Sequence, residues 1–333
     1  MGKVNSKSHS LNVFKSKKKH RQQLSSHSMS SLSTVSSSSS SETTTSQNTI
    51  TSSDDSFHYV GNRKFCKFSE KLNYVYPVDE DESDRSQTQH FMYKHVWDGN
   101  FSAPVEQMLQ DESTKVLDVG CGPGTWILDM ASEYQDAHFT GIDVAELYPL
   151  EIKPKNVSFV QANVLEGLPF DDNTFDFVYM RFMLFAFTLK NWEVAIKELI
   201  RVCKPDGFIE MMEKDIFWYN EGPFCKSART VMADELREQK NIEVVITPIL
   251  HKILSQYTEV KHEVKIIPFG EWGGKLGTLY RELYSWGAKN LKKVMTDVGF
   301  SEDEWDETIE ICLKQLQERK SYDKIHRYWI KNC

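Results

Sequence analysis

Three glycines at alternating positions, followed by an acidic residue, form the pattern in this chain with the clearest chemical meaning. The glycines are Gly120, Gly122 and Gly124, and the acidic residue is Asp143. Glycine lets the backbone turn tightly and approach a ligand where a Cβ atom would collide. A carboxylate at this interval along the chain can accept hydrogen bonds from both hydroxyls of a ribose. The spacing predicts a site for an adenosine-containing cofactor.

The flanking residues predict the elements that such a site needs. An apolar run, Lys115 to Val119, predicts a strand before the glycines, and apolar side chains at helical spacing predict a helix after them. Asp143 ends the next apolar run, at 137–143, which predicts a second strand. Thr125 stands where a dinucleotide fingerprint has its third glycine, which disfavours NAD as the cofactor.

The rest of the chain continues to alternate between strand and helix patterns. Strand patterns occur at 157–163, 175–180, 207–213, 258–269 and 325–330, and helical patterns at 84–96, 191–204, 228–240, 277–295 and 303–320. This alternation predicts an α/β fold with a doubly wound, mainly parallel sheet. Ligands bind such sheets at the carboxyl ends of the strands, where the glycines and Asp143 lie.

Composition divides the chain into three parts. Residues 1–57 are rich in Ser, Thr and Lys, contain only isolated apolar residues, and predict a disordered basic tail. Residues 58–112 predict a mostly helical N-terminal cap. Residues 113–333 predict the α/β domain. A helical insertion near 276–320 would cover the pocket for the second substrate.

Charge and cysteine content narrow the functional classes. The net charge is -8, and the tail is basic, so the folded part is more acidic than the whole. An acidic body is a poor binder of long nucleic acids. The six cysteines are scattered without a CxxC pair, which predicts reduced thiols, neither a disulfide nor a zinc site, and a cytoplasmic or nuclear location.

The motifs from Val116 to Glu210 resemble the class I S-adenosylmethionine-dependent methyltransferases. The resemblance rests on VLDVGCGPGTW, GID, QANVLEGLPFDDNTFDFVYMR and LIRVCKPDGFIE. Together with the upstream segment DRSQTQHFMYKHVWDGNFSAPV, the chain is most similar to fungal methyltransferases related to the velvet-associated regulator of secondary metabolism. The resemblance implies a Rossmann-like, seven-stranded sheet with an antiparallel last strand, and S-adenosylmethionine as cofactor.

The resemblance also implies roles for individual residues. Asp118 would meet the amino group of the cofactor, and Asn163 with the backbone of Val164 would face the adenine. Cys121 lies within the glycine loop, and Arg181 lies at the mouth of the same crevice. Plainer readings stay open: Asp143 as a helix N-cap, Asn163 as a strand terminus, and Arg181 as a structural ion-pair partner.

Methyl transfer from a sulfonium needs alignment more than it needs a catalytic residue, so the motifs identify the reaction better than the acceptor. We expect a small-molecule or protein acceptor, and the oligomeric state is open. Phe182, Phe185 and Phe187 predict either a sulfonium cradle or core packing. His90 and His95 are candidates for a general base or for structural histidines. A catalytically silent cofactor-binding partner in a nuclear complex and an NAD-dependent oxidoreductase are the alternatives.

The tail carries two signals. Met1 to Ser6 fits a loose acylation pattern, although Lys3 disfavours it, and Lys15 to Arg21 is a polybasic cluster. Together they would allow peripheral membrane contact, and the cluster alone would fit a nuclear import signal. No apolar run reaches the roughly 18 residues that a spanning helix requires.

Overall fold

The computed structural model describes residues 57–66 and 74–333. The tail, with its acylation pattern and basic cluster, lies outside the described residues. Within the described part of the chain, no helix combines the length and the apolar character needed to cross a membrane.

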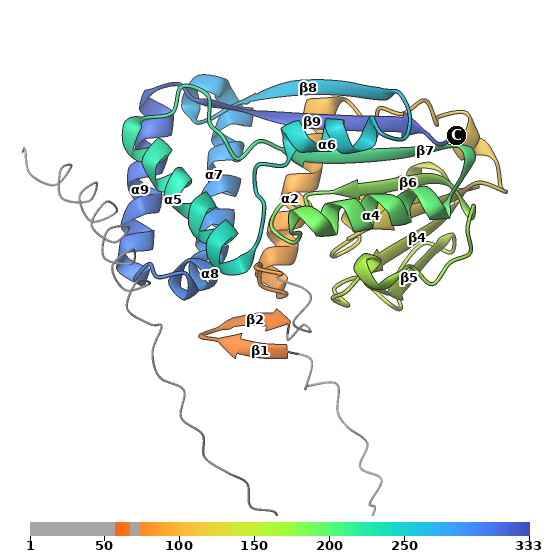
Figure 1. Ribbon diagram of the computed structural model, residues 1–333, viewed down its shortest axis with the longest axis horizontal. Helices are drawn as coiled ribbons and strands as arrows, with labels where there is room; N and C mark the ends of the chain where they lie inside the picture. Colours follow the sequence, from red (N-terminus) through yellow and green to blue (C-terminus); the bar gives the residue numbers. More distant parts are fainter. Residues whose placement is uncertain (1–56, 67–73) are drawn as a thin grey trace, which may run out of the picture. The chain divides into compact units, whose positions relative to one another are not determined.

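A seven-stranded sheet with the strand order β5-β4-β3-β6-β7-β9-β8 forms the centre of the fold (Figure 1). Neighbouring strands from β5 to β7 are parallel, whereas β9 pairs antiparallel with both β7 and β8. The expected doubly wound sheet with an antiparallel last strand is confirmed. The strands are β3 (Lys115–Val119), β4 (His138–Asp143), β5 (Val157–Gln161), β6 (Phe175–Arg181), β7 (Cys203–Lys214), β8 (Val260–Pro268) and β9 (Tyr322–Lys331).

The central strand β3 shows why the apolar runs become strands. Every residue after Lys115 in β3 is buried, as expected for a parallel strand covered on both faces. Trp126 of α3 (Thr125–Glu133) stacks on Tyr179 of β6 with ring centroids 4.0 Å apart. The side chain of Trp192 on α4 (Leu189–Val202) is also fully buried. These contacts hold the strands that end at the glycine loop.

The helices α5, α7, α8 and α9 gather at one end of the sheet (Figure 1), whereas α6 packs against β8 and β9. At that end, α5 packs against α9, and α7 packs against both α2 and α9. The helices are α2 (Glu80–Trp97), α5 (Pro223–Lys240), α6 (Thr247–Leu254), α7 (Gly274–Asn290), α8 (Lys292–Asp297) and α9 (Glu302–Glu318). Short 3-10 turns are η2 (Met108–Gln110), η3 (Val164–Glu166) and η4 (Glu271–Gly273).

Several local features differ from the sequence-based expectation. The segment expected to be mostly helical also contains a hairpin, β1 (Phe57–Val60) and β2 (Arg63–Cys66), whose connection is the turn-forming pair Gly61 and Asn62. The strand expected at 207–213 begins earlier, at Cys203, and contains a bulge: Phe175 pairs with Cys203 and Phe177 with Phe208. The helix α6 was not anticipated, although its Pro near the N-terminus is a helix-start signal.

Candidate active site

The glycine loop links the carboxyl end of β3 to the start of α3. The backbone N–H groups of Gly120 and Cys121 both donate to the carbonyl oxygen of Ile142, at 2.8 and 2.9 Å. All three glycines have positive φ angles: 71° at Gly120, 54° at Gly122 and 77° at Gly124. Other residues reach this region only with strain. The loop is therefore fixed against the end of β4 in a conformation that requires glycine.

The three glycines face different surroundings. A Cβ atom on Gly120 would lie 2.7 Å from the Met183 sulfur, and one on Gly124 would lie 2.8 Å from the Phe159 ring. A Cβ atom on Gly122 would meet no protein atom within 4 Å. The sequence-based explanation, in which all three make room for a ligand, therefore fits Gly122 but not its neighbours, which make room for protein side chains.

Asp143 supports the loop with both of its carboxylate oxygens. One oxygen accepts from the Gly122 N–H at 2.8 Å, and the other accepts from the Ala145 N–H at 2.8 Å. Burial raises the pKa of Asp143, and the backbone donors oppose that rise. No helix follows Asp143, so it is not a helix N-cap. Because a carboxylate has about four lone-pair positions, these backbone donors leave part of its acceptor capacity for a ligand such as a ribose.

Asp118 and Arg181 occupy different depths. Asp118 is 2% exposed in the middle of the sheet. Burial raises its pKa to about 7, and the positive charge of Arg181 partly offsets this rise. Arg181 is the last residue of β6, not a residue beyond it. Its guanidinium Nη1 donates to His90 Nδ1 at 3.3 Å, so its hydrogen-bond partner there is not a carboxylate.

His90 is buried and held on both ring nitrogens. Its Nδ1 faces the Arg181 guanidinium, which can only donate, so we assign the ring hydrogen to Nε2, which lies 3.1 Å from Asp129 Oδ2. Burial lowers the pKa of His90 and favours this neutral form. Neither nitrogen is available as a base in this arrangement. His95 lies exposed on α2, outside the cavity lining.

A cavity of about 260 Å³ runs along the carboxyl ends of the parallel strands. All the expected cofactor residues except Asp118 and Gly124 line it: Gly120, Cys121, Gly122, Asp143, Asn163, Val164 and Arg181. Asn163 lies past the end of β5 and caps η3, where its side-chain oxygen accepts from the Leu165 N–H at 3.0 Å. The cavity thus brings together residues from the ends of β3, β4, β5 and β6.

The three phenylalanines after β6 both pack and line the cavity. Phe187 is 1% exposed and meets the Trp192 ring edge-on at 5.2 Å. Phe182 has a positive φ of 57°, which is rare for a bulky residue, and its ring lies 5.0 Å from that of Tyr93. Such backbone strain is frequent at functional sites.

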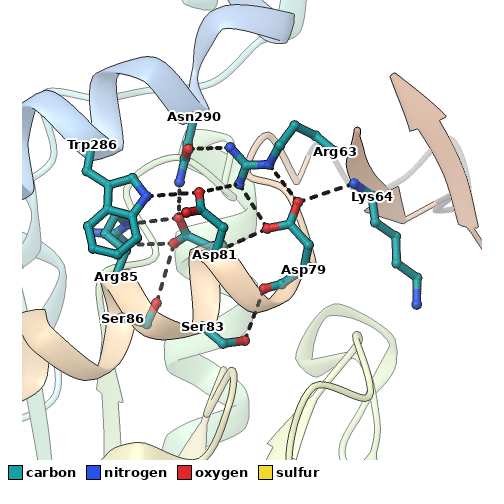
Figure 2. A network of polar contacts seen from close by, with 10 residues as sticks. Arg63, Lys64, Asp79, Asp81, Ser83, Arg85, Ser86, Trp286 and Asn290 are labelled. Atoms are coloured by element: carbon teal, nitrogen blue, oxygen red, sulfur yellow. Dashed lines mark hydrogen bonds and ion pairs between the residues drawn. The ribbon is translucent and has the colours of Figure 1, made fainter. Parts of the chain in front are cut away.

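A polar network joins the β1–β2 hairpin to α2 and α7 beside the cavity, and Figure 2 shows it. Arg63 donates to Asp79 at 2.7 Å and to Asn290 at 2.6 Å, and Asn290 in turn donates to Glu82 at 2.5 Å. Arg85, which lines the cavity, pairs with Glu82 at 2.6 Å. Sequence reasoning missed this network because Asn290, which joins its parts, lies more than 200 residues from Arg63 and Glu82.

No group of His, Cys, Asp and Glu suited to a metal ion occurs in residues 57–66 and 74–333. The cavity lining continues past Arg181 to Lys214 and Trp218 and on to α5, α7 and α9. The sequence predicted helices near this pocket but not which side chains face it.

Comparison with known proteins agrees with the geometry. Residues 116–207 match a family described as "Methyltransferase domain". The N-methyltransferase verN of Clonostachys rogersoniana is 32% identical over 43% of this chain and 50% of its own length. The secondary metabolism regulator LAE1 of Cochliobolus heterostrophus is 29% identical over 48% of this chain and 52% of its own. The chain spans about half the length of these relatives.

Among solved structures, a phosphoethanolamine N-methyltransferase of Haemonchus contortus in complex with S-adenosylhomocysteine is similar to this chain at 15% identity. The similarity covers 81% of this chain and 62% of that one, with a TM-score of 0.42. The family match covers the glycine loop, Asp143 and Arg181, which the structure places around one cavity. Residues 116–207, which match a methyltransferase domain, therefore supply the cavity lining from Val119 to Phe187.

Proposed function

We propose that this chain transfers the methyl group of S-adenosylmethionine to a small molecule bound in the same cavity. The observation that carries the proposal is the continuity of the cavity from Asp143 and Gly122 to Lys214 and Trp218. Because β4, β3, β6 and β7 are consecutive neighbours in the sheet, their carboxyl ends lie in a row. A donor at one end of this row and an acceptor at the other would meet near Arg181.

The residues at the donor end fit the cofactor. Gly122 leaves open space where a side chain would stand, and Asp143 keeps part of its acceptor capacity for a ribose. When bound, the cofactor supplies a methyl group attached to a positively charged sulfur. On transfer, the sulfur keeps the electrons of the broken C–S bond and leaves as a neutral thioether. The protein's contribution is to hold the two reactants aligned and to exclude water.

His90 is not required as a base in this proposal. Its Nδ1 accepts from Arg181 and its Nε2 donates to Asp129, so His90 positions the guanidinium at the centre of the cavity. The proton lost by the acceptor is expected to pass to solvent. Placement of the acceptor therefore matters more than proton transfer by one residue.

Calorimetry with S-adenosylmethionine, S-adenosylhomocysteine and NAD tests the donor site, and methyl-labelled cofactor with cell extract tests transfer. We expect both sulfur nucleosides to bind, NAD not to bind, and label to appear in the small-molecule fraction. Label in the protein fraction would indicate that the methyl acceptor is a protein side chain. Binding of NAD alone would contradict the proposal.

A second candidate is a catalytically silent cofactor-binding protein that acts as a regulatory partner. The names of some relatives echo this alternative: the proteins of Cochliobolus heterostrophus and Aspergillus fumigatus are named secondary metabolism regulators. Tight binding of S-adenosylmethionine without label transfer to any fraction would favour this candidate over the enzyme.

A further inference from the structure

Aromatic rings dominate the far end of the cavity, beyond Arg181. Trp218 meets Tyr284 edge-on with ring centroids 5.0 Å apart and lies 5.6 Å from the Tyr280 ring. Tyr93 of α2 packs against Phe182, with ring centroids 5.0 Å apart. All five side chains line the cavity. Rings that border a space on several sides favour a flat aromatic ligand, because stacked and edge-on contacts stabilise such a ligand.

The cations at this end are already neutralised. Lys214 Nζ donates to Asp323 at 3.3 Å, and Arg229 makes a two-bond pair with Glu221 at 2.7 and 3.1 Å. Arg85 is paired with Glu82 as described above. A phosphate or carboxylate would have to displace a buried carboxylate to reach any of these cations, so the charge pattern favours an uncharged ligand.

One buried hydroxyl at this end lacks a partner. The Tyr93 side chain is 1% exposed, and no described residue meets hydrogen-bond geometry at its oxygen, although Gln89 and Tyr280 lie beside it. It lies next to Tyr280, whose hydroxyl donates to Asp323 and accepts from Lys214 at 3.4 Å. An unpaired buried hydroxyl costs free energy, and a ligand oxygen placed here would relieve that cost.

The lining is also enclosed. Trp218, Tyr280 and Leu283 are each exposed by 7% or less, and Trp305 and Cys312 of α9, which also line the cavity, are buried as well. A side chain of another protein would have to bring its backbone past these residues. A free small molecule meets no such obstacle.

We propose that the acceptor is an uncharged, planar aromatic small molecule that carries a hydroxyl group, with this hydroxyl bonded at Tyr93 and Lys214 and the ring held by Trp218, Tyr284 and Phe182. This inference rests on the proposed function, because it describes the acceptor of that reaction. A hydroxyl suits the site because it can accept from the Lys214 ammonium and also donate to the Tyr93 oxygen.

The probes are 2-naphthol, naphthalene and 2-naphthoate, titrated against the full chain with and without saturating S-adenosylhomocysteine. We expect 2-naphthol to bind about tenfold more tightly than naphthalene, through its hydroxyl, and more tightly than the anion. Equal affinities for 2-naphthol and naphthalene, tighter binding of 2-naphthoate, or no binding of either neutral probe would overturn the inference.

The variant Tyr93→Phe removes the unpaired hydroxyl and keeps the ring. Its control is Tyr179→Phe, because Tyr179 is also buried with an unpaired hydroxyl but does not line the cavity. We expect Tyr93→Phe to lower the affinity for 2-naphthol about three- to tenfold and to leave that for naphthalene unchanged. Neither variant should lose thermal stability, since each loses only an unsatisfied group.

Two outcomes contradict the inference at this step. They are an unchanged affinity for 2-naphthol in Tyr93→Phe and an equal loss in Tyr179→Phe. Failure of the proposed function is seen separately, because S-adenosylhomocysteine binding is measured first and alone. If that nucleoside does not bind, the titrations without it still decide whether the aromatic site exists.

Discussion

Replacing Gly122 by alanine adds one methyl group to the glycine loop and so tests whether the cofactor lies against this loop. Gly122 has a φ of 54°, and its new Cβ would meet no protein atom within 4 Å. The matched control is Gly274→Ala, because Gly274 has a φ of 63°, also faces open space, and lies outside the cavity lining. Alanine at position 122 enters the left-handed region at a cost of about 1–2 kcal/mol. Gly274 has a ψ of −148°, in a positive-φ region almost restricted to glycine, so Gly274→Ala costs at least as much stability.

The two variants should differ only in binding. Calorimetry should show weaker S-adenosylhomocysteine binding in Gly122→Ala, because the methyl group enters space that the ligand needs. An overpacking cost of about 1–3 kcal/mol corresponds to a loss of roughly 5- to 150-fold. Gly274→Ala should bind like the parent protein and lose at least as much thermal stability as Gly122→Ala. The larger Gly122→Val should abolish detectable binding.

Two results would refute this reasoning. Unchanged affinity in Gly122→Ala would mean that the ligand does not occupy the space next to the loop. An equal loss of affinity in Gly274→Ala would mean that backbone strain, transmitted through the fold, explains the effect.

Three further predictions concern other parts of the site. Asp143→Asn should weaken S-adenosylhomocysteine binding at least tenfold, measured by calorimetry, because an amide cannot accept from both backbone donors and a ribose. Burial raises the pKa of Glu213 to about 8, so the folded state keeps a proton on this carboxyl group that the unfolded state loses above about pH 4.5. Stability should therefore fall as pH rises from about 4.5 to 8. Melting temperatures of Glu213→Gln should decline less over this range, and an identical decline would contradict the assignment. Arg63→Met should speed S-adenosylhomocysteine dissociation in stopped-flow measurements by loosening the hairpin, whereas Lys293→Met, which removes a surface pair on α8, should not.

The fold was largely predictable because its signals are local. The apolar run before Gly120 and the alternation of strand and helix patterns each depend on a few consecutive residues. The seven strands and the antiparallel last strand were expected from the resemblance to a known family, whereas the strand order was not predicted. The hairpin was missed although Gly61 and Asn62 are a recognised turn pair, because its strands are only four residues long.

The donor half of the site was more predictable than the acceptor half. The glycine loop and Asp143 lie within one βαβ unit, so their spacing in the sequence reflects their spacing in space. Tyr93, Lys214 and Tyr280 come from three elements far apart in the sequence, and no local pattern unites them. Sequence reasoning also assigned too many residues to the donor half. Gly124 and Asp118 belong to the motif, but they pack inside the protein and do not line the cavity.

A crystal structure of the full chain with S-adenosylhomocysteine would test the central claim most directly. We predict that the two ribose hydroxyls will lie within hydrogen-bonding distance of the Asp143 carboxylate, with the sulfur facing the cavity between Gly120 and Arg181. A nucleoside bound elsewhere, or a cavity filled by the protein's own side chains, would contradict the account.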